Sequence, residues 1–206
     1  GCEISASVQG VKLDYSIAAT GKHVAIISLS VLAVVNQLGL NVRESAQELA
    51  KFSEVEGRGR AEKITVGGAN ILLINDSYNA SPASMKAAFE KTNEVWQAQG
   101  SKGRKIALLG DMLELGMAAP KMHTELAKDL LAQGFDKVYL AGELMGFLRD
   151  NLPEDVLVCH VPSAAMLTQM VENSLQDDDV VLIKGSHGSK MYQTAQALLG
   201  EIKNAV

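Results

Sequence analysis

Residues 63–82, with the sequence KITVGGANILLINDSYNASP, decide the fold. Two short runs rich in β-branched and aliphatic residues, 63–66 and 69–75, flank Gly67-Gly68, a pair typical of a tight turn between antiparallel strands. The second run ends in a cluster of polar residues, and Pro82 then suits the first turn of a helix. The stretch therefore predicts a hairpin followed by the loop and helix of a βα unit.

The same alternation continues to the end of the chain. The predicted strands are 105–109, 137–140, 156–159 and 179–183, and the predicted helices are 82–99, 120–132, 143–150, 163–175 and 190–203. Short aliphatic strands that alternate with helices indicate an α/β fold, with a Rossmann-like, mostly parallel sheet and helices on both faces. Such sheets bind ligands outside the carboxyl ends of their strands, so the residues that follow each strand are the candidate site.

The first sixty residues have a different order of predicted strands and helices. A strand is expected over 8–17, as the second arm of a hairpin whose first arm is missing. A helix over 23–38 carries apolar residues nearly all round, which predicts a buried helix, and Gly39 ends it. An amphipathic helix is expected over 42–52. The glycine- and charge-rich residues 54–60 then predict a linker at a domain boundary.

Composition excludes several classes of protein. The chain has 206 residues, a formal net charge of −5 and 47% hydrophobic residues, which is enough for one large domain or for one domain plus a piece of another. The sequence has no basic patch and few aromatic residues, which argues against a nucleic-acid partner. No run approaches the roughly 18 apolar residues of a membrane span. Cys2 and Cys159 form no metal-binding or disulfide pattern.

No signal peptide is visible, so the expected location is the cytoplasm. The start at Gly1 rather than Met indicates a processed, trimmed or engineered boundary.

The loop after the first buried strand is rich in functional groups. It contains Asp76, Tyr78, Asn79 and Ser81, just before a helix N-terminus whose free backbone N–H groups suit phosphate or carboxylate. The alternative is that Asp76 and Ser81 only cap a turn and the helix.

Two later strand ends add further candidates. Asp111 and Glu114, bracketed by glycines, could hold a ligand amine or a cation, or could belong to an ordinary loop; His123 fits packing better than catalysis. Lys184 leaves a hydrophobic strand into a Gly/Ser loop with Ser186, where it could reach an anion. The chain contains no G-x-x-x-x-G-K-[ST] P-loop, no G-x-S-x-G and no H-E-x-x-H motif.

Three of these strings together resemble the Mur ligase family. They are NDSYNASPASM at 75–85, LGDMLELG at 109–116 and IKGS at 183–186, and Tyr78-Asn79 favours the dipeptide-adding member. The stretch after Gly21-Lys22-His23 resembles the end of the family's central ATPase domain. The implied domains are residues 1–56 for that end, 57–62 for a hinge and 63–206 for the C-terminal domain.

The resemblance implies an ATP-dependent amide-bond ligase of cell-wall synthesis. In such enzymes a carboxylate of UDP-N-acetylmuramoyl-tripeptide becomes an acyl phosphate, and D-Ala-D-Ala attacks it. The implied catalytic residues are Asp76, Asn79 and Lys184, and the implied nucleotide contacts are His23, Arg58, Asp76 and Tyr78. The implied substrate contacts are Asn79, Ser81, Asp111, Glu114 and Ser186. ATP is the implied cofactor, the ligands for Mg²⁺ are expected in upstream domains of the same enzyme, and this chain is expected to be inactive alone.

Two alternatives stay open. Four residues after His23 the family carries an asparagine near the adenine, and here that position is Ile27, which forms no side-chain hydrogen bond. The chain could therefore be a non-catalytic module of Mur-ligase descent that binds a nucleotide or a partner protein. A third hypothesis is a sister ligase that adds a different amino acid, against which Tyr78-Asn79 argues.

Overall fold

The computed structural model describes residues 1–18, 22–52 and 57–200, and of Lys22 and His23 it describes the backbone only. The chain forms two compact units, Gly1–Val55 and Glu56–Val206. No helix in the described ranges has the length and apolar character needed to cross a membrane.

The first unit is a hairpin covered by helices. Strands β1 (Cys2–Val8) and β2 (Val11–Ile17) pair antiparallel, and helices α1 (Lys22–Gln37) and α2 (Val42–Glu48) follow, with a 3₁₀ turn η1 (Leu49–Lys51). The first arm of this hairpin was predicted to be missing, and that prediction is wrong. The Gln9-Gly10 turn has positive φ at both residues, 47° and 87°, as tight hairpins require.

Helix α1 is not buried all round, contrary to the sequence prediction. Its inner face packs through Leu32, which is fully buried, and through Ser28, whose hydroxyl lies 2.7 Å from the Tyr15 hydroxyl. Along the helix and its C-terminal turn, Ile26, Ile27, Val31, Val34 and Leu38 are exposed. The reason is the size of the unit, since a two-stranded sheet and one short helix can cover only part of a sixteen-residue helix.

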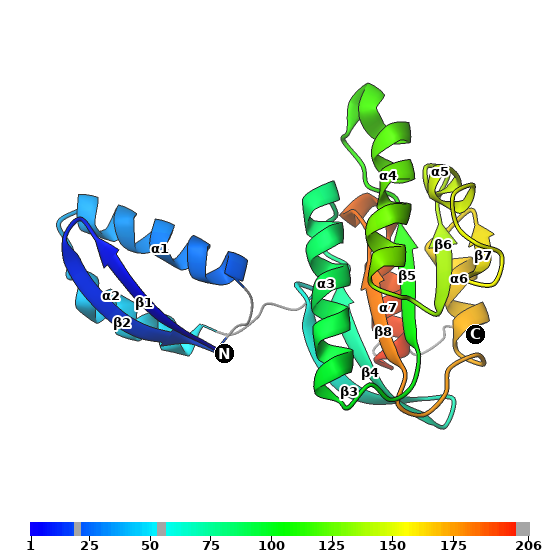
Figure 1. Ribbon diagram of the computed structural model, residues 1–206, viewed down its shortest axis with the longest axis horizontal. Coiled ribbons are helices and arrows are strands. Elements are labelled where there is room, and N and C mark those ends of the chain that lie inside the picture. Colours follow the sequence, from blue (N-terminus) through cyan, green and yellow to red (C-terminus); the bar gives the residue numbers. More distant parts are fainter. Residues whose placement is uncertain (19–21, 53–56, 201–206) are drawn as a thin grey trace. The chain divides into compact units, whose positions relative to one another are not determined.

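The second unit contains a six-stranded sheet in the order β3-β4-β8-β5-β6-β7 (Figure 1). Its strands are β3 (Arg60–Val66), β4 (Ala69–Asp76), β5 (Lys105–Gly110), β6 (Lys137–Ala141), β7 (Leu157–Val161) and β8 (Val180–Lys184). The β3–β4 pair is antiparallel and the other pairs are parallel. The predicted α/β fold with a mostly parallel sheet is confirmed, although β3 begins three residues earlier than expected.

Helices cover both faces of this sheet (Figure 1). Those on one face are α3 (Pro82–Ala98), α4 (Ala119–Ala132, after a 3₁₀ turn η2, Gly116–Ala118) and α5 (Met145–Arg149). Those on the other are α6 (Ala164–Val171) and α7 (Met191–Leu198), the latter after a 3₁₀ turn η3 (His187–Ser189). Strand β8 is buried along its whole length because it lies at the centre of the sheet and between both helical layers.

Gly103, just before β5, lies in close contact with the backbone just before β8. Gly103 has a φ of +67°, and a Cβ there would collide with the carbonyl oxygen of Asp178. We expect Gly103→Ala to lower the free energy of unfolding by about 2–3 kcal/mol, because a strained backbone and a steric overlap act together. Gly100→Ala is the matched control, since Gly100 also has positive φ but open space around it. Equal losses for the two variants in urea unfolding would exclude the proposed overlap.

Candidate functional site

The centre of the candidate site is an ion pair between the ends of two neighbouring strands. Asp76 ends β4 and Lys184 ends β8, and the two residues lie opposite each other in the parallel register. The Lys184 Nζ donates to Asp76 Oδ2 at 2.5 Å and to the backbone oxygen of Asn79 at 2.9 Å. The Lys184 side chain is 1% exposed, whereas that of Asp76 keeps 21% of its surface, so the carboxylate is the member of the pair that a ligand can reach.

Positive charge exceeds negative charge around Asp76. Burial raises the pKa of the Asp76 carboxyl, and Lys184, Lys91 and Arg58 act in the opposite direction. Burial likewise lowers the pKa of the Lys184 ammonium, while Asp76 raises it. One carboxylate is thus surrounded by three cationic side chains. This donor set fits a polyanion such as the phosphates of a nucleotide, with Arg58 as its exposed member.

Rings and cations form a second feature of this edge. The Arg58 guanidinium carbon lies 4.3 Å from the centre of the Tyr78 ring, and the ring centres of Tyr78 and His187 are 5.9 Å apart. His187 in turn stacks on Tyr192 at 4.9 Å. Arg58 is positioned because Gly57 accepts a hydrogen bond from the Tyr78 amide and Gly59 donates one to Asn75. The predicted nucleotide contacts Arg58, Asp76 and Tyr78 therefore lie together in one part of the second unit.

Asn79 and Ser81 have local partners in the loop after β4. The Asn79 side-chain oxygen accepts from the Ala80 amide at 2.8 Å, although the residue itself is exposed. Ser81 is the N-cap of α3: its hydroxyl accepts from the Ser84 amide at 3.3 Å, and the Ser84 hydroxyl accepts from the Ser81 amide at 2.9 Å. Ser81 thus caps helix α3, which was the alternative to ligand binding considered from the sequence.

Ser186 joins the loops that follow three strands. Its hydroxyl accepts from the Leu113 amide at 2.9 Å and donates to the Ala80 carbonyl at 3.3 Å, and its own amide donates to the Asp111 carbonyl at 2.9 Å. The residue is 5% exposed. Ser186 therefore fixes the relative positions of the loops after β4, β5 and β8.

Asp111 and Glu114 differ in their environments. The Asp111 carboxylate accepts from the Met145 amide at 2.9 Å, at the start of α5. Burial raises the pKa of this carboxyl, and hydrogen bonds from the backbone of Met145 and Leu144 lower it. Glu114 is exposed and has a φ of +63°, an uncommon conformation for a residue other than glycine. Asp111 is half-buried and Glu114 is exposed, so the Glu114 carboxylate is the more open of the two to a ligand.

His23 lies outside the described side chains. Among the residues that the structure describes, no three His, Cys, Asp or Glu side chains gather closely enough to hold a metal ion. The candidate site is instead mainly cationic. Its cationic set does fit the phosphates of ATP.

Sequence reasoning missed two residues of this region, Lys91 and His187, and it favoured a packing role for His123. Lys91, on α3, contributes to the field at Asp76, and His187 contacts Tyr78 and Tyr192. His123 is fully buried beneath the loop after β5. A signal for His123 exists, because it shares the periodic apolar face of α4 with Ala119, Leu126, Ala127 and Leu130.

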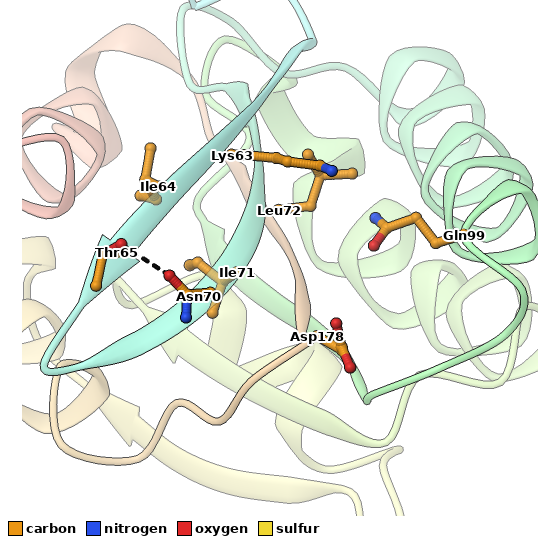
Figure 2. A pocket seen from close by; sticks show the side chains of 8 residues that line it. All are labelled: Lys63, Ile64, Thr65, Asn70, Ile71, Leu72, Gln99 and Asp178. Carbon is orange, nitrogen blue, oxygen red and sulfur yellow. Dashed lines mark hydrogen bonds between the residues drawn. The ribbon is translucent and has the colours of Figure 1, made fainter.

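A hollow on the second unit lies away from these residues (Figure 2). It has a volume of about 240 Å³ between the β3–β4 hairpin and the end of α3, and Lys63, Leu72, Gln99 and Asp178 are among its lining residues. The hollow borders the first half of β4, whereas the candidate site residues begin at the carboxyl end of that strand, with Asp76. None of the predicted site residues lines it.

Comparison with known proteins assigns the family. The family described as "Mur ligase, glutamate ligase domain" matches residues 59–187, which include every predicted site residue from Asp76 to Ser186. The chain belongs to the Mur ligase family. It is 33% identical over 179 residues to the UDP-N-acetylmuramoyl-tripeptide–D-alanyl-D-alanine ligase of Rickettsia prowazekii, covering 87% of this chain and 38% of that protein.

Solved structures of Mur ligases show the same fold. A UDP-N-acetylmuramoylalanyl-D-glutamyl-2,6-diaminopimelate–D-alanyl-D-alanyl ligase from Acinetobacter baumannii superposes with a TM-score of 0.75 at 20% identity, covering 96% of this chain and 41% of that one. The MurF ligase of Thermotoga maritima in complex with ADP gives a TM-score of 0.63 at 25% identity, covering 93% and 40%. This Mur ligase chain thus spans only about two-fifths of the length of these relatives.

Proposed function

We propose that this chain is the C-terminal part of a cytoplasmic, ATP-dependent Mur ligase that joins D-Ala-D-Ala to UDP-N-acetylmuramoyl-tripeptide. In this proposal residues 1–56 end the central ATP-binding domain, 57–62 form a hinge and 63–206 form the C-terminal domain. Upstream domains supply the P-loop and the ligands for Mg²⁺, so the 206 residues alone do not catalyse the reaction. The relatives named above carry this activity in their names.

The observation that carries the proposal is the Asp76–Lys184 pair with its surplus of positive charge. In the proposed reaction the γ-phosphoryl group of ATP passes to the tripeptide carboxylate, and the dipeptide amine then displaces phosphate. Negative charge develops on the phosphoryl oxygens during both steps, and preorganised cations stabilise such charge most where water is excluded. In this proposal Arg58 meets the nucleotide phosphates. Asp76 and Tyr78 contact the ribose or the phosphates of the same nucleotide.

The remaining residues are assigned to the dipeptide side. Glu114 offers an exposed carboxylate for the ammonium group of D-Ala-D-Ala. Asn79 offers its side-chain amide, and Lys184 holds the backbone of its loop through the Asn79 carbonyl. Ser81, Asp111 and Ser186 act in this scheme by fixing the loops around the substrate, since their own polar groups bond the protein.

The test of the function uses the complete natural polypeptide that contains this chain. We expect ADP release only when both UDP-N-acetylmuramoyl-tripeptide and D-Ala-D-Ala are present. Nucleotide binding without turnover would replace the proposal with a non-catalytic module of Mur-ligase descent. Turnover with a different amino acid in place of the dipeptide would instead indicate a sister ligase.

Arg58 gives the sharpest variant for this function. We expect Arg58→Ala to raise the KM for ATP roughly 10- to 150-fold, because one charge-assisted contact to phosphate contributes about 1.5–3 kcal/mol. The control is Arg60→Ala, since Arg60 is also exposed but pairs with Glu62 at 3.0 Å. Equal KM values for the two variants would remove Arg58 from the nucleotide site.

A further inference from the structure

His123 makes two hydrogen bonds inside the second unit, and together they define its protonation. The residue is 0% exposed. Its Nε2 lies 3.0 Å from the Met112 amide nitrogen, and its Nδ1 lies 2.7 Å from the Ala119 carbonyl oxygen. An amide can only donate and a carbonyl can only accept, so Nε2 must be the acceptor and Nδ1 must carry the proton. His123 is therefore held as the neutral Nδ1–H tautomer.

The Met112 amide belongs to the loop that carries Glu114. The Met112 side chain is itself fully buried, and the next amide along the chain, that of Leu113, donates to Ser186 at 2.9 Å. His123 therefore holds the loop from α4, and Ser186 holds it from the loop after β8. Two consecutive amides held by acceptors from two different elements leave little freedom for the residue that follows them. That residue is Glu114, in its left-handed conformation.

We infer that His123 is a positioning residue of the ligase: it fixes the loop 111–116 so that the Glu114 carboxylate meets the ammonium group of the incoming amino substrate. This inference rests on the proposed function. His123 does not touch the substrate. It acts through the Met112 amide, which an apolar residue of the same size would leave buried without an acceptor.

Three substitutions at position 123 separate the two hydrogen bonds. In His123→Gln the side-chain oxygen can take the place of Nε2 and accept from Met112. In His123→Asn the shorter amide can take the place of Nδ1 and donate to Ala119, but it offers no acceptor at the position of Nε2. His123→Leu removes both bonds and keeps an apolar side chain on the buried face of α4. If the Met112 bond is the one that matters, Gln should rescue what Asn and Leu lose.

The first readout needs no activity. We expect amide hydrogen exchange at Met112 to be at least about 10-fold faster in the Leu and Asn variants than in the wild type, and to return toward the wild-type rate in the Gln variant. Heteronuclear NMR of the wild-type ring should show Nδ1 protonated and Nε2 unprotonated. A proton on Nε2, or unchanged exchange at Met112 in the Leu variant, would overturn the inference irrespective of any ligase assay.

The second readout is kinetic and uses the complete polypeptide. His123→Leu should raise the KM for D-Ala-D-Ala about 10-fold while the KM for ATP and kcat change less than about 3-fold, since only the amino-substrate contact is disturbed. Glu114→Gln should raise the same KM, and the double variant should show no further increase. Additive effects, or equal changes in both KM values, would reject the positioning role. Absence of dipeptide-dependent turnover in the wild type would instead refute the proposed function, and the exchange result would then report on the loop alone.

Discussion

Lys184→Met is expected to lower the ligation rate of the complete enzyme about 100-fold, because the Asp76 carboxylate and the Asn79 loop both lose the group that positions them. Met has a similar length and fills the space of a side chain that is 1% exposed, but it provides no ammonium group for Asp76 or for the Asn79 carbonyl. Breaking a buried ion pair also destabilises the fold. Because Asp76 keeps some contact with solvent, we expect the loss to lie near the lower end of the usual range, about 3 kcal/mol.

The same variant should change the protonation of Asp76. Lys184 lowers the pKa of that carboxyl in the native protein, so the pKa should move further upward when the ammonium is removed. NMR titration of the Asp76 carboxyl measures this shift. Lys86→Met is the control, because Lys86 is an exposed lysine on helix α3. A folded Lys184→Met enzyme with a ligation rate within about threefold of wild type would remove the ion pair from the mechanism.

Asp179→Ala is expected to have the largest effect on stability, a loss of about 3–5 kcal/mol in the free energy of unfolding. The Asp179 carboxylate is buried and accepts from the Arg104 amide, from two nitrogens of the Arg104 guanidinium and from the Gln176 amide. These bonds join the start of β5 to the start of β8. Hydrogen bonding to Asp179 also raises the pKa of Arg104, the direction expected when the charged form is favoured.

Urea unfolding of the chain measures this loss. The control is Asp155→Ala, since Asp155 is exposed and its backbone oxygen, which the substitution keeps, accepts the hydrogen bond from Lys137. The two variants should differ in midpoint while the slope with urea stays the same. A loss below about 1 kcal/mol for Asp179→Ala would show that the cluster contributes no more than an ordinary surface contact.

Most of the second unit could be predicted from the sequence, and the reason is the character of its strands. Strands such as β5 and β8 are short, aliphatic and buried along their whole length, so their apolar runs stand out between helical segments. Prediction was weaker where burial is one-sided. Strand β1 was missed because its alternating polar residues resemble a surface loop, and α1 was predicted as buried because periodicity does not reveal how much protein is available to cover a helix.

The position of the candidate site was predictable, whereas its internal contacts were not. The rule that ligands bind at the carboxyl ends of parallel strands points to the loops after β4, β5 and β8. Which side chains cap a helix, as Ser81 does, and which join loops, as Ser186 does, depends on the register between strands distant in sequence. Lys91 was missed for the same reason, since it acts across a gap between elements, and the hydrogen bond from the Met112 amide to His123 could not be predicted either.

The position of β8 in the sheet determines when this protein can complete its fold during synthesis. Strand β8 follows the other five strands of its sheet along the chain and yet lies between β4 and β5, so newly made chains hold two open strand edges until β8 has left the ribosome. Lys184, the partner of Asp76, is synthesised 108 residues after it. Folding and assembly of the site thus coincide in a single late event, and a chain cut short before β8 should be cleared as an unfolded polypeptide rather than persist as a weakened enzyme.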